Sequence, residues 1–193
     1  MNLPTKLSVS RILLTFGLLA ALLTPGLAAK LIALAVFIVA SLTDWLDGML
    51  ARRRGELTPL GALLDPIADK VLVLGAFLAF VQLRLVPAWM VLVIMLRELV
   101  ITGIRLIAAN RQVVLAAAAE GKHKTVSQMA TIVLVLGIVV AREALGAGLN
   151  PAADHAMMQA IIVAMWVTVG LTVVSGGSFF WRHRAVLRYV IGR

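Results

Sequence analysis

Six long apolar segments separated by short breaks constrain the fold of this chain more than any other feature. They lie near residues 10–24, 28–50, 62–82, 86–109, 125–146 and 155–180. A helix needs about 20 apolar residues to cross the hydrocarbon core of a bilayer. Helix-breaking residues mark the gaps between segments, at Pro25-Gly26, Pro59, Pro87 and Pro151. The pattern therefore predicts an all-α polytopic membrane protein with six transmembrane helices, forming a single domain over residues 1–193.

The composition supports this fold class. Hydrophobic residues make up 62% of the chain and charged residues only 14%, a balance that excludes an ordinary soluble domain. The chain has no cysteine, which excludes disulfides and thiolate chemistry. Only Lys6 and Arg11 precede the core of the first apolar segment, and no cleavage site follows it. We interpret that segment as a retained helix and not as a signal peptide.

The distribution of lysine and arginine predicts the orientation in the membrane. Lys30, Arg84 and Arg142 fall on one side of the predicted bundle, and most of the other basic residues fall at the opposite side. Cytoplasmic segments of membrane proteins are enriched in lysine and arginine. We therefore expect both termini and the turn near residues 53–60 to face the cytoplasm, in an inner (plasma) membrane of bacterial type. This topology and anionic lipid headgroups explain the net charge of +9, so no nucleic-acid partner is required.

An acidic motif lies at the predicted cytoplasmic ends of the second and third segments. At helical spacing, two one-sided stripes form: Asp44, Asp47, Gly48, Ala51 and Arg52 on the first helix, and Gly61, Asp65 and Asp69 on the next. At about 3 kcal/mol per central charge, four carboxylates cost on the order of 10 kcal/mol against insertion unless cations neutralise them. Two divalent ions would balance the charge, and oxygen-only ligands favour Mg²⁺ or Mn²⁺. The alternative, in which the acids cap helices or pair with arginines, does not explain the glycines.

The spacing D-x2-D-G-x2-A-R-x8-G-x3-D-x3-D resembles the signature of the CDP-alcohol phosphatidyltransferases at every fixed position. The resemblance implies a membrane enzyme that uses CDP-diacylglycerol and is commonly a homodimer. It implies that Asp44, Asp47 and Asp65 are the principal metal ligands, and that Asp69 is the general base with a further metal contact. It places the cytidine diphosphate group between the helices, beside the small residues Gly48, Ala51 and Gly61, with Arg52 close to the diphosphate.

Other segments resemble the phosphatidylglycerophosphate synthase branch of that family. They are Arg97-Glu98 followed by Arg105, the sequence G-K-x-K-T-x-x-Q at 121–128, and the opening residues 2–11. This resemblance implies sn-glycerol 3-phosphate as the acceptor, with phosphatidylglycerophosphate and CMP as products. The phosphate group of glycerol 3-phosphate needs cationic side chains to bind it. The candidates are Arg105, Lys124 and Arg182, with Thr125 as a supporting hydrogen-bond donor. Ordinary cytoplasmic flanking charge with a helix cap remains the alternative for residues 121–128.

Several alternatives stay open at this stage. Lys70 and Glu98 fall at similar estimated depth, so Glu98 is either part of a structural ion pair or a functional group. The same chemistry could serve phosphatidylglycerol, serine or inositol phosphate as acceptor. An intramembrane prenyltransferase also binds Mg²⁺-diphosphate through aspartates, although its acid motifs usually lie far apart in sequence. A divalent-cation transporter would need acids along a path through the bilayer, and the fifth and sixth segments carry none in their cores.

Overall fold

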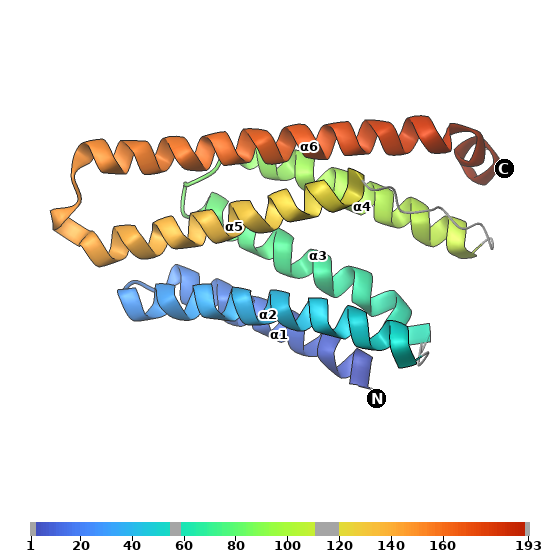
Figure 1. Cartoon of the computed structure of the whole chain (residues 1–193), viewed down its shortest axis with the longest axis horizontal. Coiled ribbons are helices and arrows are strands. Elements are labelled where there is room, and N and C mark those ends of the chain that lie inside the picture. Colours follow the sequence, from blue (N-terminus) through green and yellow to red (C-terminus); the bar gives the residue numbers. More distant parts are fainter. Residues whose placement is uncertain (1–2, 55–58, 111–119, 192–193) are drawn as a thin grey trace.

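The computed structural model describes residues 3–54, 59–110 and 120–191, and the regular structure of these residues is entirely helical (Figure 1). The elements are α1 (Leu3–Leu23), α2 (Leu27–Arg54), α3 (Pro59–Gln82), α4 (Ala88–Asn110), α5 (Glu120–Leu145), the short 3₁₀ helix η1 (Gly146–Gly148) and α6 (Pro151–Ile191). Each apolar segment of the sequence corresponds to one α-helix. The all-α prediction is therefore confirmed for the described residues.

The residues that interrupt the apolar segments also fix the helix ends. Pro59 and Pro151 are the first residues of α3 and α6, positions where the missing N–H of proline leaves no intrahelical bond unmade. Asn150 caps α6, because its Oδ1 accepts a hydrogen bond of 2.9 Å from the backbone N–H of Ala152. Gly26, between α1 and α2, has a φ angle of 106°, a backbone conformation that residues other than glycine rarely adopt. Local turn chemistry thus explains why the connections are short.

Successive helices run in alternating directions along the bundle (Figure 1). The α1–α2, α3–α4 and α5–α6 connections lie toward one end, and the end of α2, the start of α3 and the end of α6 lie toward the other. Helix α3 packs against α1, α4 and α5, while α6 packs against α4 and α5. This arrangement places the two acid-bearing helix segments at the same end of the molecule as the start of α1.

Close packing holds α1 against α3. A Cβ atom on Gly75 of α3 would lie only 2.7 Å from Cγ2 of Thr15 on α1, so the absence of a side chain at this position permits the approach. Phe77 and Phe80 of α3 are fully buried and meet edge to face, with ring centroids 6.2 Å apart. In a bilayer, helices associate through such van der Waals contacts, because burial against another helix gains little over burial in lipid.

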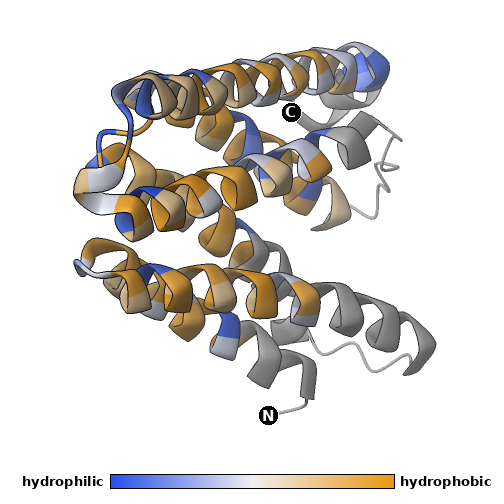
Figure 2. Cartoon of the chain, turned by 60° about the vertical axis from the view of Figure 1, so that its left-hand side comes forward, coloured by the Kyte–Doolittle hydropathy of each residue, from blue (hydrophilic) through white to orange (hydrophobic). Residues whose placement is uncertain are grey.

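The outer surface of the bundle is largely apolar. Leu13, Phe16 and Val174 are 66%, 63% and 68% exposed, and Figure 2 shows hydrophobic residues along most of the coloured helices. Soluble monomers rarely expose contiguous apolar patches beyond a few hundred Å². Among the described residues, Lys124–Gly148 and Pro151–Arg184 are long and apolar enough to span a membrane. Six spans remain a prediction. The charged residues Arg97, Glu98 and Arg105 break the apolar sequence of α4, and the acidic motif breaks the apolar sequence of α2 and α3.

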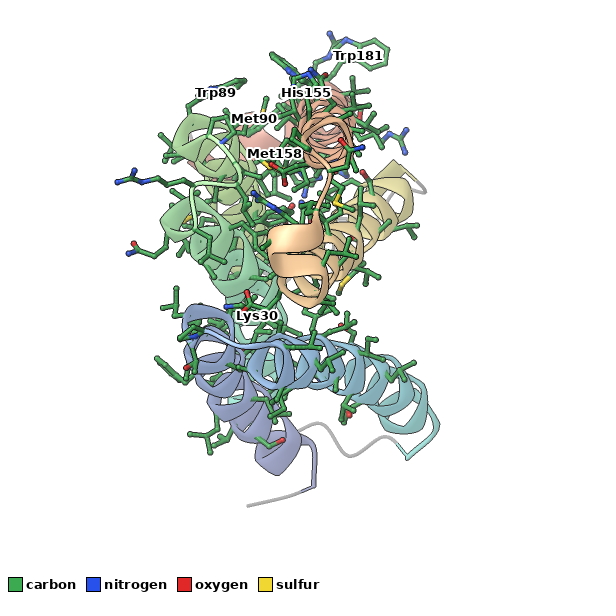
Figure 3. The ribbon with its side chains drawn as sticks, turned by 90° about the vertical axis from the view of Figure 1, so that its left-hand side faces the viewer. Lys30, Trp89, Met90, His155, Met158 and Trp181 are labelled. Atoms are coloured by element: carbon green, nitrogen blue, oxygen red, sulfur yellow. The ribbon has the colours of Figure 1, made fainter. Side chains whose placement is uncertain are left out.

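Polar contacts close the end of the bundle opposite the acidic motif, which Figure 3 views directly. The buried Lys30 of α2 donates from Nζ to the carbonyl oxygens of Leu22 and Thr24, at 2.5 and 2.8 Å, and so satisfies the last turn of α1. The N–H of Gly26 donates to Glu143 Oε1 of α5 at 2.6 Å. These bonds tie the α1–α2 turn to the rest of the molecule.

Candidate active site

The acidic motif lies on two consecutive antiparallel helices. Asp44 and Asp47 belong to α2, and Asp65 and Asp69 belong to α3; the backbone is helical at all four positions. Because residues three or four apart on an α-helix lie on the same face, each pair of aspartates shares one face of its helix. The side chains of residues 44–66 and of Asp69 lie outside the described residues, including those of Ala51 and Arg52. The assignments of metal ligands, general base and nucleotide contacts therefore stay predictions.

Among the described side chains, no group of three or more histidines or acids could hold a metal ion. The side chains of the predicted ligands Asp44, Asp47, Asp65 and Asp69 all lie outside that part of the chain, so the metal site stays a prediction.

Glu98 is the centre of a buried charge cluster next to the predicted site. Its side chain is 2% exposed, and its Oε2 forms an ion pair with Nζ of Lys70 of α3 at 2.7 Å. The other oxygen, Oε1, accepts from Arg97 at 3.0 Å, from Lys124 of α5 and from Gln128 at 3.5 Å. The Lys70–Glu98 ion pair, one of the two alternatives that the sequence left open for Glu98, is present. One carboxylate thus joins α3, α4 and α5, and the four charged groups carry a formal net charge of +2.

Arg97 extends this cluster to α6. Its Nη2 donates to Ser175 Oγ at 2.8 Å. The packing beside this contact is close, because a Cβ on Gly176 would lie 3.3 Å from Cγ of Arg97 and would shift one of them by a few tenths of an ångström. The Nε atom of Arg97 is buried without a hydrogen-bond partner among the described residues. The cluster therefore reaches four helices, with Arg97 as its link to α6.

A row of hydroxyl groups continues the polar interface between α5 and α6. Thr168 lies 2.8 Å from both Ser127 and Thr131, measured between the hydroxyl oxygens. These three side chains are buried or half-buried. Inside a helix bundle, their hydrogen bonds to one another take the place of hydrogen bonds to water. The start of α5 is thereby held against α6 on the same side as Lys124.

The predicted acceptor residues come from three different helices. Arg105 lies on α4, and its guanidinium stacks over the ring of Phe179 of α6, 5.5 Å from the centroid. Lys124 is buried at the start of α5 and pairs with Glu98, whereas Thr125 next to it is exposed. Arg182 is exposed on α6, less than one turn beyond Phe179. The stacking brings α4 and α6 together near two of the candidates, and a common phosphate site remains a prediction.

Sequence reasoning missed most of the cluster around Glu98. It paired Glu98 with Lys70 and gave Lys124 a role at the substrate, but it did not connect Arg97, Lys124 and Gln128 to one carboxylate. A signal was present, since Lys124 and Gln128 are four residues apart and share a helical face. The hydroxyl row had a similar signal in Ser127 and Thr131.

The comparisons with known proteins agree with the acidic motif. The chain matches the family model described as CDP-alcohol phosphatidyltransferase over residues 1–174. It is 37% identical to a Bacillus subtilis (strain 168) protein named CDP-diacylglycerol–glycerol-3-phosphate 3-phosphatidyltransferase, over 97% of each chain. It is 40% identical to a probable phosphatidylglycerophosphate synthase of Mycobacterium tuberculosis (strain H37Rv), over 68% of this chain and 64% of that one. A Yersinia pestis protein with the same name as the Bacillus relative is 35% identical, over 70% of this chain and 77% of that one.

Proposed function

The chain belongs to the CDP-alcohol phosphatidyltransferase family, and on this premise we propose that it transfers a phosphatidyl group from CDP-diacylglycerol to sn-glycerol 3-phosphate. The products are phosphatidylglycerophosphate and CMP. The observation that carries the proposal is the near-full-length similarity to the Bacillus protein, whose name states this reaction. The acidic motif, whose four aspartates lie at helical spacing on α2 and α3, supports the same chemistry. The apolar exterior is consistent with a donor that is itself a membrane lipid.

The donor set on α2 and α3 fits divalent metal ions, which this family uses. Asp44, Asp47, Asp65 and Asp69 supply only carboxylate oxygens, at helical spacings on consecutive helices, and such ligands suit Mg²⁺ or Mn²⁺. We propose that two ions are held there, with Asp44, Asp47 and Asp65 as the principal ligands and only a further contact from Asp69. Metal ions bound there would supply charge neutralisation on the diphosphate and on the departing CMP.

The residues of the chain divide the remaining work. Asp69 accepts the proton of the glycerol 3-phosphate hydroxyl, whose oxygen forms a bond to the phosphatidyl phosphorus while the bond to the CMP oxygen breaks. Gly48, Ala51 and Gly61 leave space for the nucleotide between α2 and α3, and Arg52 pairs with the diphosphate. Arg105, Lys124 and Arg182 bind the acceptor phosphate, with Thr125 donating to it. These roles rest on the family motif and on the chemistry of each side chain.

The setting of the site follows from the charge distribution. We propose a multi-pass protein of an inner (plasma) membrane, with six spans, both termini in the cytoplasm and the acidic motif near the cytoplasmic surface. CDP-diacylglycerol would enter from the leaflet and glycerol 3-phosphate from the cytoplasm. A homodimer is the expected assembly of the family.

A panel of acceptors tests the proposal. The purified protein is given CDP-diacylglycerol, Mg²⁺ and equal concentrations of glycerol 3-phosphate, serine, inositol phosphate or phosphatidylglycerol, and the lipid products are identified by mass spectrometry. We expect phosphatidylglycerophosphate to be the dominant product. Preference for another alcohol would overturn the acceptor while leaving the transfer chemistry intact. Absence of CMP release with every acceptor would overturn the whole proposal.

A further inference from the structure

Glu98 lies where three helices meet, and each helix contributes a donor to its carboxylate. Lys70 comes from α3, Arg97 from α4 itself, and Lys124 and Gln128 from α5. The proposed reaction assigns no role to Glu98, Lys70, Arg97 or Gln128. A carboxylate that is 2% exposed and accepts from donors on two other helices, besides its neighbour Arg97, needs an explanation.

Stability alone is a weak explanation for this arrangement. Removing a carboxylate and its cations from water costs several kcal/mol per ion, and well-packed apolar side chains often replace buried ion pairs without loss of stability. What a buried ionic network does supply is a fixed geometry, because all of its contacts are made together in only one arrangement of the helices. The contacts of Glu98 therefore restrict the rotation and axial position of the helices that they join.

The helices joined by Glu98 carry predicted catalytic and binding groups. Lys70 directly follows Asp69, the predicted general base, and one residue corresponds to about 100° of rotation around a helix. Anchoring Lys70 to Glu98 consequently fixes the direction in which the Asp69 position faces. On α5, the pair with Lys124 fixes the N-terminal part of the helix, which also carries Thr125. The hydroxyl bonds of Ser127 and Thr131 to Thr168 hold the following turns of α5 against α6.

From these contacts we infer that Glu98 is a positioning residue for phosphatidyl transfer, which holds the general-base position of α3 in register with the acceptor side of α5. The inference rests on the proposed function, because the step that it affects is the transfer itself. Glu98 need not touch either substrate. Its loss should change how often bound substrates react more than how tightly the donor lipid binds.

Two substitutions separate positioning from charge balance. Glu98→Gln keeps the shape of the side chain and removes its charge, whereas Glu98→Asp keeps the charge and withdraws the carboxylate by about 1.5 Å. Misplacement of a reacting group by about 1 Å can cost up to 10²-fold in rate. We expect kcat to fall about 10-fold or more in Glu98→Gln and about 3-fold or more in Glu98→Asp. The KM for CDP-diacylglycerol should stay within about 3-fold of wild type in both variants.

Glu143→Gln is the matched control. Glu143 also joins two helical regions, through the N–H of Gly26, but it lies at the opposite end of the bundle. The kcat of the Glu143→Gln variant should remain at the wild-type value. The thermal midpoint and the folded fraction are measured for each variant, and kcat is expressed per folded protein. If Glu98→Gln does not fold, Glu98→Asp carries the test.

The outcomes distinguish the inference from the proposed function. Wild-type kcat per folded protein in Glu98→Asp would show that only charge balance is needed, and would overturn the positioning role. A parallel rise in the KM of CDP-diacylglycerol with unchanged kcat would also overturn it. If the wild-type protein uses another acceptor, the acceptor assignment fails, and the same kcat ratios measured with that acceptor still decide the role of Glu98.

Discussion

The four acids of the motif carry the chemistry at the scale of single residues. Asparagine at Asp44, Asp47, Asp65 or Asp69 should each lower turnover by about 10²-fold or more, because each substitution removes a metal ligand or the base from a phosphoryl-transfer site. Asp154→Asn is the control, since Asp154 pairs with Arg142 at the far end of the bundle. Turnover of membrane-inserted protein is the measurement.

The same series separates the roles of the acids. Asp69→Asn should retain binding of CDP-diacylglycerol and metal, as expected for a base, whereas the other three variants should lose affinity for the metal. Isothermal titration with Mn²⁺ provides the comparison. Near-normal turnover in any two of the four variants would rule out the two-metal site.

The acceptor phosphate should depend on the cations of α4, α5 and α6. Alanine at Arg105, Lys124 or Arg182 removes one charge-assisted contact, worth about 1.5–3 kcal/mol, and should raise the KM for glycerol 3-phosphate about 10-fold or more. The KM for CDP-diacylglycerol should change much less. Arg84→Ala, in the turn between α3 and α4, is the control. Normal acceptor KM values in all three variants would place the phosphate elsewhere.

Only part of the residue-scale picture could be predicted from sequence. The similar depth of Lys70 and Glu98 along their helices indicated an ion pair as one of two alternatives, and the structure places their charged atoms 2.7 Å apart. Depth does not specify rotation around each helix, so the convergence of Arg97 and Lys124 on the same carboxylate could not be predicted in this way. The motif was recognisable because its spacing is local to two consecutive helices.

At the scale of elements, proline, glycine and the apolar segments were enough to predict the α-helices. Their lengths were harder to predict. The sixth apolar segment ends near residue 180, but α6 continues to Ile191 and has 41 residues. That corresponds to about 60 Å, against about 30 Å for a hydrocarbon core. The last part of the helix contains several arginines, so the apolar pattern that predicts the helix ends before the helix does.

The contact of α1 with α3 should be sensitive to a single methyl group. Gly75→Ala places a Cβ 2.7 Å from Thr15 Cγ2, and overpacking of this kind costs about 1–3 kcal/mol. We expect a lower thermal midpoint in detergent. Thr15→Ser removes Cγ2 but keeps the hydroxyl that donates to the carbonyl of Arg11, so the double variant should recover stability.

Gly137→Ala is the control for this experiment, since nothing lies within 4 Å of a Cβ at that helical position. It should be neutral or stabilising, because alanine favours a helix over glycine by about 1 kcal/mol. Equal stability of Gly75→Ala and wild type would contradict the close approach of α1 and α3.

At the scale of the whole molecule, the alternating helices make the two ends of the bundle distinct. The chain has no cysteine, so single cysteines can be introduced without further changes. Cysteines at Arg54 and Arg111 should react with a membrane-impermeant thiol reagent from the cytoplasmic side, and those at Arg84 and Asn150 from the opposite side. Arg111 itself lies outside the described residues. Reversed labelling would contradict the orientation inferred from the basic residues.

Metal-dependent phosphatidyl transfer to glycerol 3-phosphate is the central claim, and the stoichiometry of its two products tests it most directly. The purified protein is incubated with CDP-diacylglycerol and labelled glycerol 3-phosphate, and CMP and lipid-bound label are counted together. We predict one phosphatidylglycerophosphate per CMP, complete loss of both products with a chelator, and recovery on adding Mg²⁺. Release of CMP without labelled lipid, or transfer that persists in the chelator, would contradict it.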